Sequence, residues 1–219
     1  MKKLVIFDLD GTLLDTLDDL AASANHAVGT VGVAPYTREE IRSFVGNGAN
    51  NLIRLCLGER VEALPACVAA FRAYYDAHLC DATKPYEGIV ELLRQLDGAG
   101  VKCAVLSNKP DFAVEKLCRR YFGNLLGICR GQQEGVPLKP DPAALFGIVS
   151  DYGFPKEDCL YVGDSDVDIE TARRAGMDGV AVSWGFRPKE ELIKKGATVV
   201  IDRPQELLQL IQRFSNNLA

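Results

Sequence analysis

No stretch of the 219-residue sequence is long and apolar enough to suggest a membrane span. The first apolar run, Leu4 to Phe7, ends at Asp8, whereas a span needs about 18 consecutive apolar residues. The same run is too short for the apolar region of a signal peptide. We therefore expect a cytoplasmic protein with no membrane partner.

An excess of basic residues is also missing. The chain has 25 Lys and Arg against 30 Asp and Glu, a formal net charge of −5. Nucleic-acid-binding proteins usually carry a basic surface, so this balance argues against nucleic acid as a partner. The hydrophobic content of 47% argues against disorder.

Paired metal-binding motifs are absent as well. The seven cysteines are scattered and contain no C-x-x-C, and neither His26 nor His78 has the spacing of a metal ligand. These absences argue against a zinc site or a disulfide framework and predict reduced thiols in a reducing compartment. We interpret both histidines as structural or exposed.

Short apolar runs recur along the chain, separated by segments of helical length. Continuous apolar runs are typical of strands buried on both faces of a parallel sheet, and their alternation with helices predicts an α/β fold with a doubly wound parallel sheet. The runs cover 3–8, 101–106, 159–162, 179–182 and 198–201, with a weaker candidate at 126–129, and the helical segments cover 87–98, 111–121, 142–151, 167–175 and 204–214.

This alternation stops between the first two strands, where only helical spacing is found. The interruption is far longer than a crossover connection needs. The sequence therefore predicts a core domain of residues 1–15 and 84–219 and a small all-helical domain of residues 16–83 inserted into it.

Polar residues follow three of the predicted strands. Ligands bind beyond the carboxyl ends of the strands in an open parallel sheet, so we expect these residues to share one crevice. Lysine and carboxylates with no His or Cys nearby favour Mg²⁺ and a phosphoryl group. Each motif alone also fits a turn or a helix cap. The residues are Asp8 and Asp10, then Ser107 and Asn108, then Asp164 and Asp168, with Lys139 before the third of these strands.

The chain resembles the haloacid dehalogenase (HAD)-like phosphatase superfamily over essentially its whole length. The motifs that carry the resemblance are, in chain order, Asp8-Leu9-Asp10-Gly11-Thr12-Leu13 with Asp15-Thr16, then Ser107-Asn108, Lys139, and Gly163-Asp164 with Asp168. The resemblance implies a Rossmann-like core, and the inserted segment resembles the helical cap of these enzymes. Val167 stands where many relatives carry Asn, and Asp166 matches no fixed family position.

The resemblance also implies a role for each matched residue. Asp8 would be the nucleophile that accepts the phosphoryl group, and Asp10 would be the general acid and base. Mg²⁺ would be held by Asp8, the main-chain carbonyl of Asp10 and Asp164, with Asp168 orienting the site. Lys139 would neutralise charge beside Asp8, while Thr12, Ser107 and Asn108 would contact the substrate.

The turn at Val45-Gly46-Asn47-Gly48 is similar to one found in phosphoglycolate phosphatases, which also carry Asn-Lys-Pro as at Asn108-Lys109-Pro110. It would face the crevice, where Asn47 and Gly48 would either contact the substrate or only form a turn. This likeness makes 2-phosphoglycolate the leading substrate.

Three functions are compatible with these residues. The favoured one is a Mg²⁺-dependent phosphomonoesterase that forms an aspartyl-phosphate, as a monomer or homodimer. A sugar-phosphate mutase of the same superfamily is the second. A non-catalytic binding module is the third, and the intact set of Asp8, Asp10, Lys139 and Asp164 disfavours it.

Overall fold

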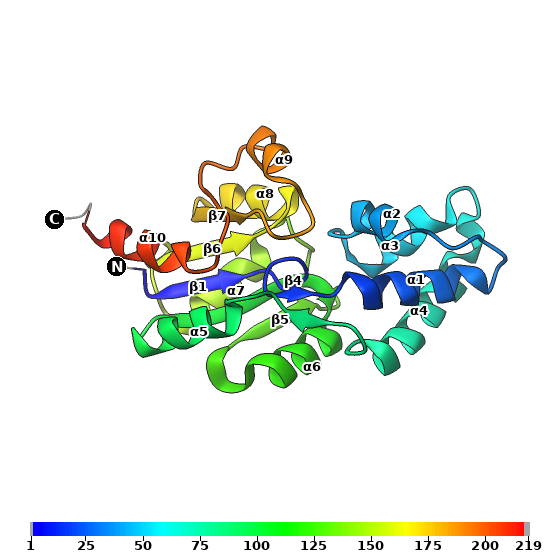
Figure 1. The fold of residues 1–219 in the computed structure, drawn as a ribbon, viewed down its shortest axis with the longest axis horizontal. Helices are drawn as coiled ribbons and strands as arrows, with labels where there is room; N and C mark the ends of the chain where they lie inside the picture. Colours follow the sequence, from blue (N-terminus) through cyan, green and yellow to red (C-terminus); the bar gives the residue numbers. More distant parts are fainter. Residues whose placement is uncertain (1, 217–219) are drawn as a thin grey trace.

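A six-stranded parallel sheet forms the centre of the computed structural model, which describes residues 2–216 (Figure 1). The strand order β5-β4-β1-β6-β7-β8 and the parallel pairings confirm the predicted α/β fold. The strands are β1 (Leu4–Phe7), β4 (Lys102–Pro110), β5 (Cys129–Gln132), β6 (Cys159–Gly163), β7 (Asp178–Val182) and β8 (Val200–Ile201). The weak candidate at 126–129 overlaps the observed β5 only at Cys129, so the strand begins three residues later than predicted.

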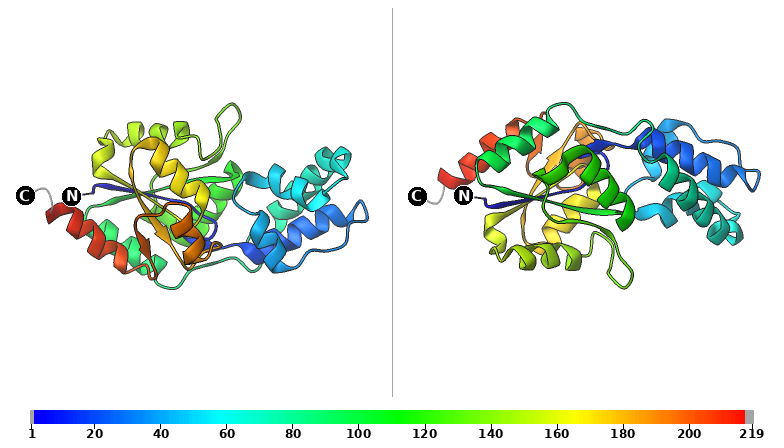
Figure 2. Two further views of the ribbon diagram at one scale, coloured as in Figure 1. Left: turned by 90° about the horizontal axis from the view of Figure 1, so that it is seen from above. Right: turned by 90° about the horizontal axis from the view of Figure 1, so that it is seen from below.

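Helices cover both faces of this sheet, because successive side chains of β1 point to opposite sides. Leu4 and Ile6 pack with α7 and α8, whereas Val5 and Phe7 belong to the hydrophobic cluster of α5, α6 and α10. Figure 2 shows the two layers. The helices are α5 (Ile89–Gly98), α6 (Asp111–Phe122), α7 (Ala143–Tyr152), α8 (Asp166–Ala175), α9 (Lys189–Lys194) and α10 (Glu206–Asn216).

Four further helices form a separate group beyond one end of the sheet (Figure 1). They are α1 (Leu17–Gly29), α2 (Arg38–Phe44), α3 (Gly48–Leu57) and α4 (Leu64–His78), and we call this group the cap. Its apolar faces pack together around fully buried side chains such as Ile53 and Phe71. Within the described residues, no helix has the length and apolar character needed to span a membrane.

Two short strands connect the cap to the rest of the chain. β2 (Leu14–Asp15) pairs in an antiparallel manner with β3 (Lys84–Pro85). Asp19 of α1 reinforces this junction, because its carboxylate accepts hydrogen bonds from the main-chain amides of Ala82 and Thr83. The sequence did not indicate this ribbon, and the domain boundaries at 15/16 and 83/84 stay a prediction.

Candidate active site

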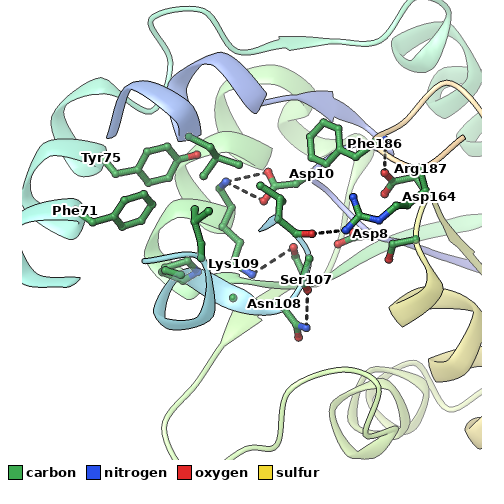
Figure 3. Close-up of a pocket in the computed structure, with 18 residues that line it drawn as sticks. Asp8, Asp10, Phe71, Tyr75, Ser107, Asn108, Lys109, Asp164, Phe186 and Arg187 are labelled. Carbon is green, nitrogen blue, oxygen red and sulfur yellow. Dashed lines mark hydrogen bonds and ion pairs between the residues drawn. The ribbon is translucent and has the colours of Figure 1, made fainter. Parts of the chain in front are cut away.

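The carboxyl ends of β4, β1 and β6 lie side by side and face the cap. A cavity of about 50 Å³ lies between them (Figure 3). Six of the predicted residues line this cavity, and they come from all three strand ends and from the cap. They are Asp8, Asp10, Gly48, Ser107, Asn108 and Asp164.

Asp8 directly follows β1, and its main-chain amide donates to the carbonyl of Val162 at 2.8 Å. Lys139 Nζ lies 3.0 Å from Asp8 Oδ1 as an ion pair, but Oδ1 accepts no hydrogen bond from any described residue. Burial raises the pKa of Asp8 to about 6; Lys139 opposes this rise, and the charge of Asp168 adds to it. Asp8 is therefore a buried carboxylate that lines the cavity and is paired with an ammonium group.

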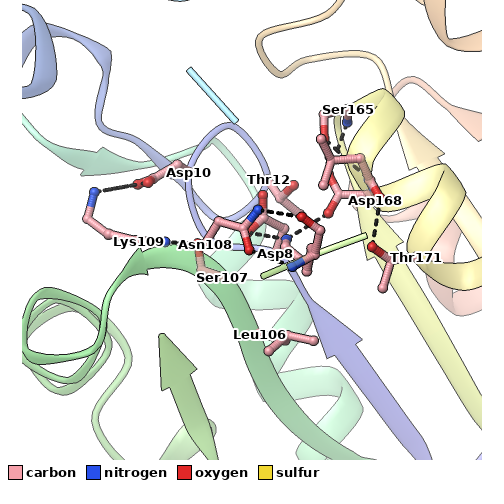
Figure 4. A network of polar contacts seen from close by, with 12 residues as sticks. Asp8, Asp10, Thr12, Leu106, Ser107, Asn108, Lys109, Ser165, Asp168 and Thr171 are labelled. Atoms are coloured by element: carbon pink, nitrogen blue, oxygen red, sulfur yellow. Dashed lines mark hydrogen bonds and ion pairs between the residues drawn. The ribbon is translucent and has the colours of Figure 1, made fainter. Parts of the chain in front are cut away.

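Lys139 is buried and forms ion pairs with two carboxylates, those of Asp8 and Asp168, both of which are labelled in Figure 4. Its Nζ donates to Asp168 Oδ1 at 2.8 Å and to the Tyr161 hydroxyl at 3.0 Å. Burial alone would lower the pKa of Lys139, but Asp168 and Asp8 outweigh it and raise the pKa well above its usual range. The amine is therefore held as an ammonium ion beside Asp8.

Asn108 fixes the main chain of Lys139. Its Oδ1 accepts from the Lys139 amide at 2.8 Å, and its Nδ2 donates to the Lys139 carbonyl at 3.0 Å. Asn108 Nδ2 also donates to the carbonyl of Gly46 in the cap at 3.1 Å. One side chain thus joins β4, the Lys139 loop and the cap.

Asp168 lies behind Lys139 and does not line the cavity. It forms a capping box at the start of α8, in which the amide and hydroxyl of Ser165 donate to Asp168 Oδ2 at 3.1 and 2.5 Å. The Tyr161 hydroxyl donates to the other oxygen, Oδ1, at 3.0 Å. Asp168 is thereby fixed and in turn holds Lys139.

Asp164 follows β6 and is 1% exposed. Its two oxygens accept from the Thr12 hydroxyl at 3.1 Å and from the amide of Phe186 at 2.6 Å. Burial raises its pKa well above the usual range. Gly11 has φ +82°, and a Cβ there would lie 2.2 Å from Asp164 Oδ2, so this close approach requires glycine.

Thr12 differs from the substrate contact that the sequence suggested. It is fully buried, its hydroxyl is bonded to Asp164, and it does not line the cavity. The hydroxyl therefore orients a carboxylate and does not face a ligand.

The carboxylates meet the requirements of a divalent cation site. Asp8, Asp164 and Asp168 each offer an oxygen, and these atoms lie within 4.8 Å of one another. Since Asp168 is already bonded to Lys139, Tyr161 and Ser165, Asp8 and Asp164 are the better ligands. An all-oxygen donor set suits Mg²⁺.

We expect Mg²⁺ to stabilise the folded protein at pH 7.5. At 100 times its dissociation constant, a ligand adds about 2.7 kcal/mol to the free energy of unfolding, which in a chain of this size raises Tm by about 5–10 °C. The gain should shrink at pH 5, since protonation of Asp8 and Asp164, whose pKa values are raised, competes with the ion. Thermal unfolding with and without Mg²⁺ measures this, and Asp164→Asn should remove most of the gain. An equal gain in wild type and variant would contradict the assignment.

Asp10 is held by two donors. Its Oδ1 accepts from the Thr16 hydroxyl at 2.7 Å, and both its oxygens accept from Lys109 Nζ, at 2.9 and 3.0 Å. The role of Lys109 was missed from the sequence. The available signal was a lysine directly after Ser107 and Asn108, but the sequence does not show where the ammonium group lies.

The turn before α3 brings Val45 and two glycines to the cavity. Gly46 and Gly48 line it, whereas Asn47 is exposed and does not. A Cβ at Gly48 would lie 3.4 Å from the carbonyl oxygen of Asn108, and Gly48 has φ +81°. Of the two predicted cap residues, only Gly48 therefore lines the cavity.

Two arginines join the cap to the loop after β7. Arg42 of α2 donates to the carbonyls of Phe186, at 2.7 Å, and Gly185, at 3.3 Å. In the other direction, Arg187 donates to the carbonyls of Arg42, at 2.9 Å, and Val45, at 2.8 Å. We call these four hydrogen bonds the arginine clasp. The clasp keeps the cap over Asp164, because the Phe186 amide binds that carboxylate.

Removing half of the clasp should weaken substrate binding. Arg187→Met loses two hydrogen bonds from a charged donor, and one such bond contributes about 1.5–3 kcal/mol. We expect KM to rise about tenfold or more, with a smaller change in kcat. Steady-state kinetics measures this, with the exposed Arg203→Met as the matched control. A normal KM in Arg187→Met would show that the clasp does not contribute to substrate binding.

The comparisons with known proteins agree with this geometry. A sequence model of the haloacid dehalogenase-like hydrolases matches residues 5–182. Phosphoglycolate phosphatase 1 of Pseudomonas aeruginosa is 35% identical over 95% of this chain and 79% of its own length. A crystal structure from Lactobacillus delbrueckii subsp. bulgaricus, of a protein predicted to be a phosphoglycolate phosphatase, is 35% identical with a TM-score of 0.89, over 96% of this chain and 98% of that one. A second crystal structure, from Haemophilus somnus and of a protein with the same predicted activity, is 27% identical with a TM-score of 0.87. It covers 95% of this chain and 97% of its own.

The chain therefore belongs to the haloacid dehalogenase-like hydrolase family. It is an enzyme of the phosphoric monoester hydrolase class.

Proposed function

We propose that this enzyme hydrolyses 2-phosphoglycolate through an aspartyl-phosphate formed on Asp8. One observation carries the mechanism: the Asp8 carboxylate lines the cavity, its Oδ1 lies 3.0 Å from the ammonium group of Lys139, and Asp10, two residues further on, lines the same cavity. The activity named for the relatives from Pseudomonas supports the choice of substrate.

In the first half-reaction an Asp8 oxygen attacks phosphorus and the bond from phosphorus to the ester oxygen breaks. Asp10 gives its proton to the departing alkoxide, which leaves as glycolate. Asp8 and Asp10 both line the cavity, so both can reach a bound ester.

In the second half-reaction Asp10, now a carboxylate, takes a proton from water. The resulting hydroxide attacks phosphorus, the bond from phosphorus to Asp8 breaks, and inorganic phosphate leaves. Ser107, which also lines the cavity, donates its hydroxyl proton to a phosphoryl oxygen, whereas both Nδ2 donors of Asn108 are already bonded to the carbonyls of Gly46 and Lys139. Both carboxyl groups thus return to their starting forms.

Lys139 lowers the free energy of both transition states electrostatically, since it is buried and always charged. Mg²⁺ would be held by the carboxylates of Asp8 and Asp164 and the main-chain carbonyl of Asp10. When bound, it neutralises charge on the phosphoryl oxygens.

Product analysis tests this proposal. Purified protein with Mg²⁺ should release one inorganic phosphate for each 2-phosphoglycolate consumed, and should act on it faster than on the other members of a panel of phosphate esters. Faster interconversion of sugar phosphates, without stoichiometric release of phosphate, would favour a mutase instead.

A further inference from the structure

The cavity continues past Asp10 toward helix α4 of the cap. In Figure 3, Asp10 and Lys109 lie between Asp8 and Tyr75. The cap side chains that line this part, Leu20, Leu52 and Phe71, are apolar. Two polar groups of this region, on Lys109 and Tyr75, have no function in the mechanism above.

Lys109 brings a positive charge to this part of the cavity. Its Nζ donates to both oxygens of Asp10, at 2.9 and 3.0 Å, and lies 4.7 Å from the centroid of the Tyr75 ring. Burial alone would lower the pKa of Lys109, but the Asp10 carboxylate more than offsets this and raises it. Lys109 is therefore a charged donor in surroundings that strengthen its attraction for an anion.

Tyr75 has an unused donor. Its side chain is 1% exposed and lines the cavity, yet its hydroxyl has no hydrogen-bond partner among the described residues. Burial raises the pKa of this hydroxyl, so it keeps its proton. A buried hydroxyl without a partner destabilises the folded protein, and a ligand group that accepts from it would remove that cost.

We propose that Lys109 and Tyr75 form a carboxylate-binding subsite that makes this enzyme specific for small phosphorylated acids. The proposal rests on the proposed function, because it assigns the part of the same substrate that does not react. The ammonium of Lys109 and the hydroxyl of Tyr75 each donate a hydrogen bond to the carboxylate.

The position of Lys109 suits such a substrate. The ester oxygen must reach Asp10 to receive its proton, and Lys109 Nζ lies 2.9 Å from an oxygen of the same Asp10. In phosphoglycolate the carboxylate carbon is only two bonds from the ester oxygen, so the carboxylate can reach Lys109.

Besides Lys109, the cation among the described residues that line this cavity is Arg187, and it is already bound to the cap. Arg187 donates to two carbonyls of the cap, those of Arg42 and Val45. These bonds fix Arg187 at the junction of the cap and the loop after β7, whereas Lys109 Nζ lies 2.9 Å from Asp10, the group that must contact the ester oxygen. Lys109 is therefore the cation that we assign to the carboxylate.

Two esters of nearly equal size test the subsite: 2-phosphoglycolate and its neutral carboxamide, 2-phosphoglycolamide. For wild type we expect kcat/KM to be about 100-fold higher for the acid. The ratio should fall at least tenfold in Lys109→Met, and about threefold to tenfold in Tyr75→Phe, mainly through KM. Lys102→Met, an exposed lysine at the other end of β4, is the control and should keep the wild-type ratio.

Two results would overturn the subsite and leave the proposed function standing. One is a wild-type ratio near one. The other is a wild-type ratio retained in both Lys109→Met and Tyr75→Phe while both esters are hydrolysed more slowly, because these residues would then only position Asp10. If Lys109→Met does not fold, the ratio in Tyr75→Phe decides. Wild type that releases no phosphate from either ester would instead remove the proposed function itself, and the subsite with it.

Discussion

Replacement of Asp8 by Asn is expected to lower kcat by about 10⁴-fold or more, the scale of loss when a nucleophile is removed. An amide cannot form the acyl phosphate, so neither half-reaction proceeds. Phosphate release from 2-phosphoglycolate measures the loss. The matched control is Asp166→Asn: Asp166 is a partly exposed carboxylate of α8, 3.7 Å from Lys195, and its removal should leave kcat within about twofold.

The same variant should not lose stability. The pKa of Asp8 is raised to about 6, so the folded state binds this proton more tightly than the unfolded state does. The free energy of unfolding of the metal-free protein therefore falls as the pH rises from about 4 to about 6. Asp8→Asn removes this contribution, so its Tm at pH 7.5 without metal should equal or exceed that of wild type. Substantial turnover by a well-folded Asp8→Asn protein would rule out Asp8 as the nucleophile.

Lys139→Met should have the second large effect, on stability and activity together. The substitution keeps an unbranched side chain one atom shorter but leaves Asp8 and Asp168 without the positive charge that both contact. Breaking a buried ion pair costs about 3–5 kcal/mol of stability, and we expect kcat to fall about 10³-fold. Thermal unfolding without metal and steady-state kinetics measure the two losses.

A double variant separates the loss of stability from the loss of activity. Lys139→Met combined with Asp168→Asn removes one of the two carboxylates that lost their positive partner, so it should recover part of the stability and none of the activity. Lys189→Met breaks an exposed ion pair with Asp202 and should cost less than about 1 kcal/mol. Near-normal kcat in Lys139→Met would show that the ammonium only supports the fold.

The sheet could be predicted from the sequence because its inner strands are buried on both faces. Leu4, Val5, Ile6 and Phe7 are each at most 1% exposed, so every position is apolar and the run is continuous. β2 and β3 contain two residues each, and α9 contains six, which is too short for a repeating pattern. The β2–β3 ribbon depends on pairing Leu14 with Pro85, far along the chain.

The site shows the same division between local and distant information. Asp8, Asp10 and Asp164 could be predicted because each lies in a short polar segment directly after an apolar run. The hydrogen bonds of Arg187 join it to residues more than 140 positions away, so no local sequence pattern predicts them. Lys109 lay beside a recognised motif, but its contact with Asp10 spans 99 positions. Contacts of this kind arise only once the strands and cap have packed.

Chemical trapping on the Asp10→Asn variant tests the central claim most directly. With p-nitrophenyl phosphate, whose leaving group needs no proton, the first half-reaction should proceed while hydrolysis of the phosphoenzyme is slow. We predict a burst of one p-nitrophenol per enzyme and, after borohydride reduction and peptide mass spectrometry, homoserine at position 8. Steady turnover without a burst, or a trapped group at any other residue, would contradict the account.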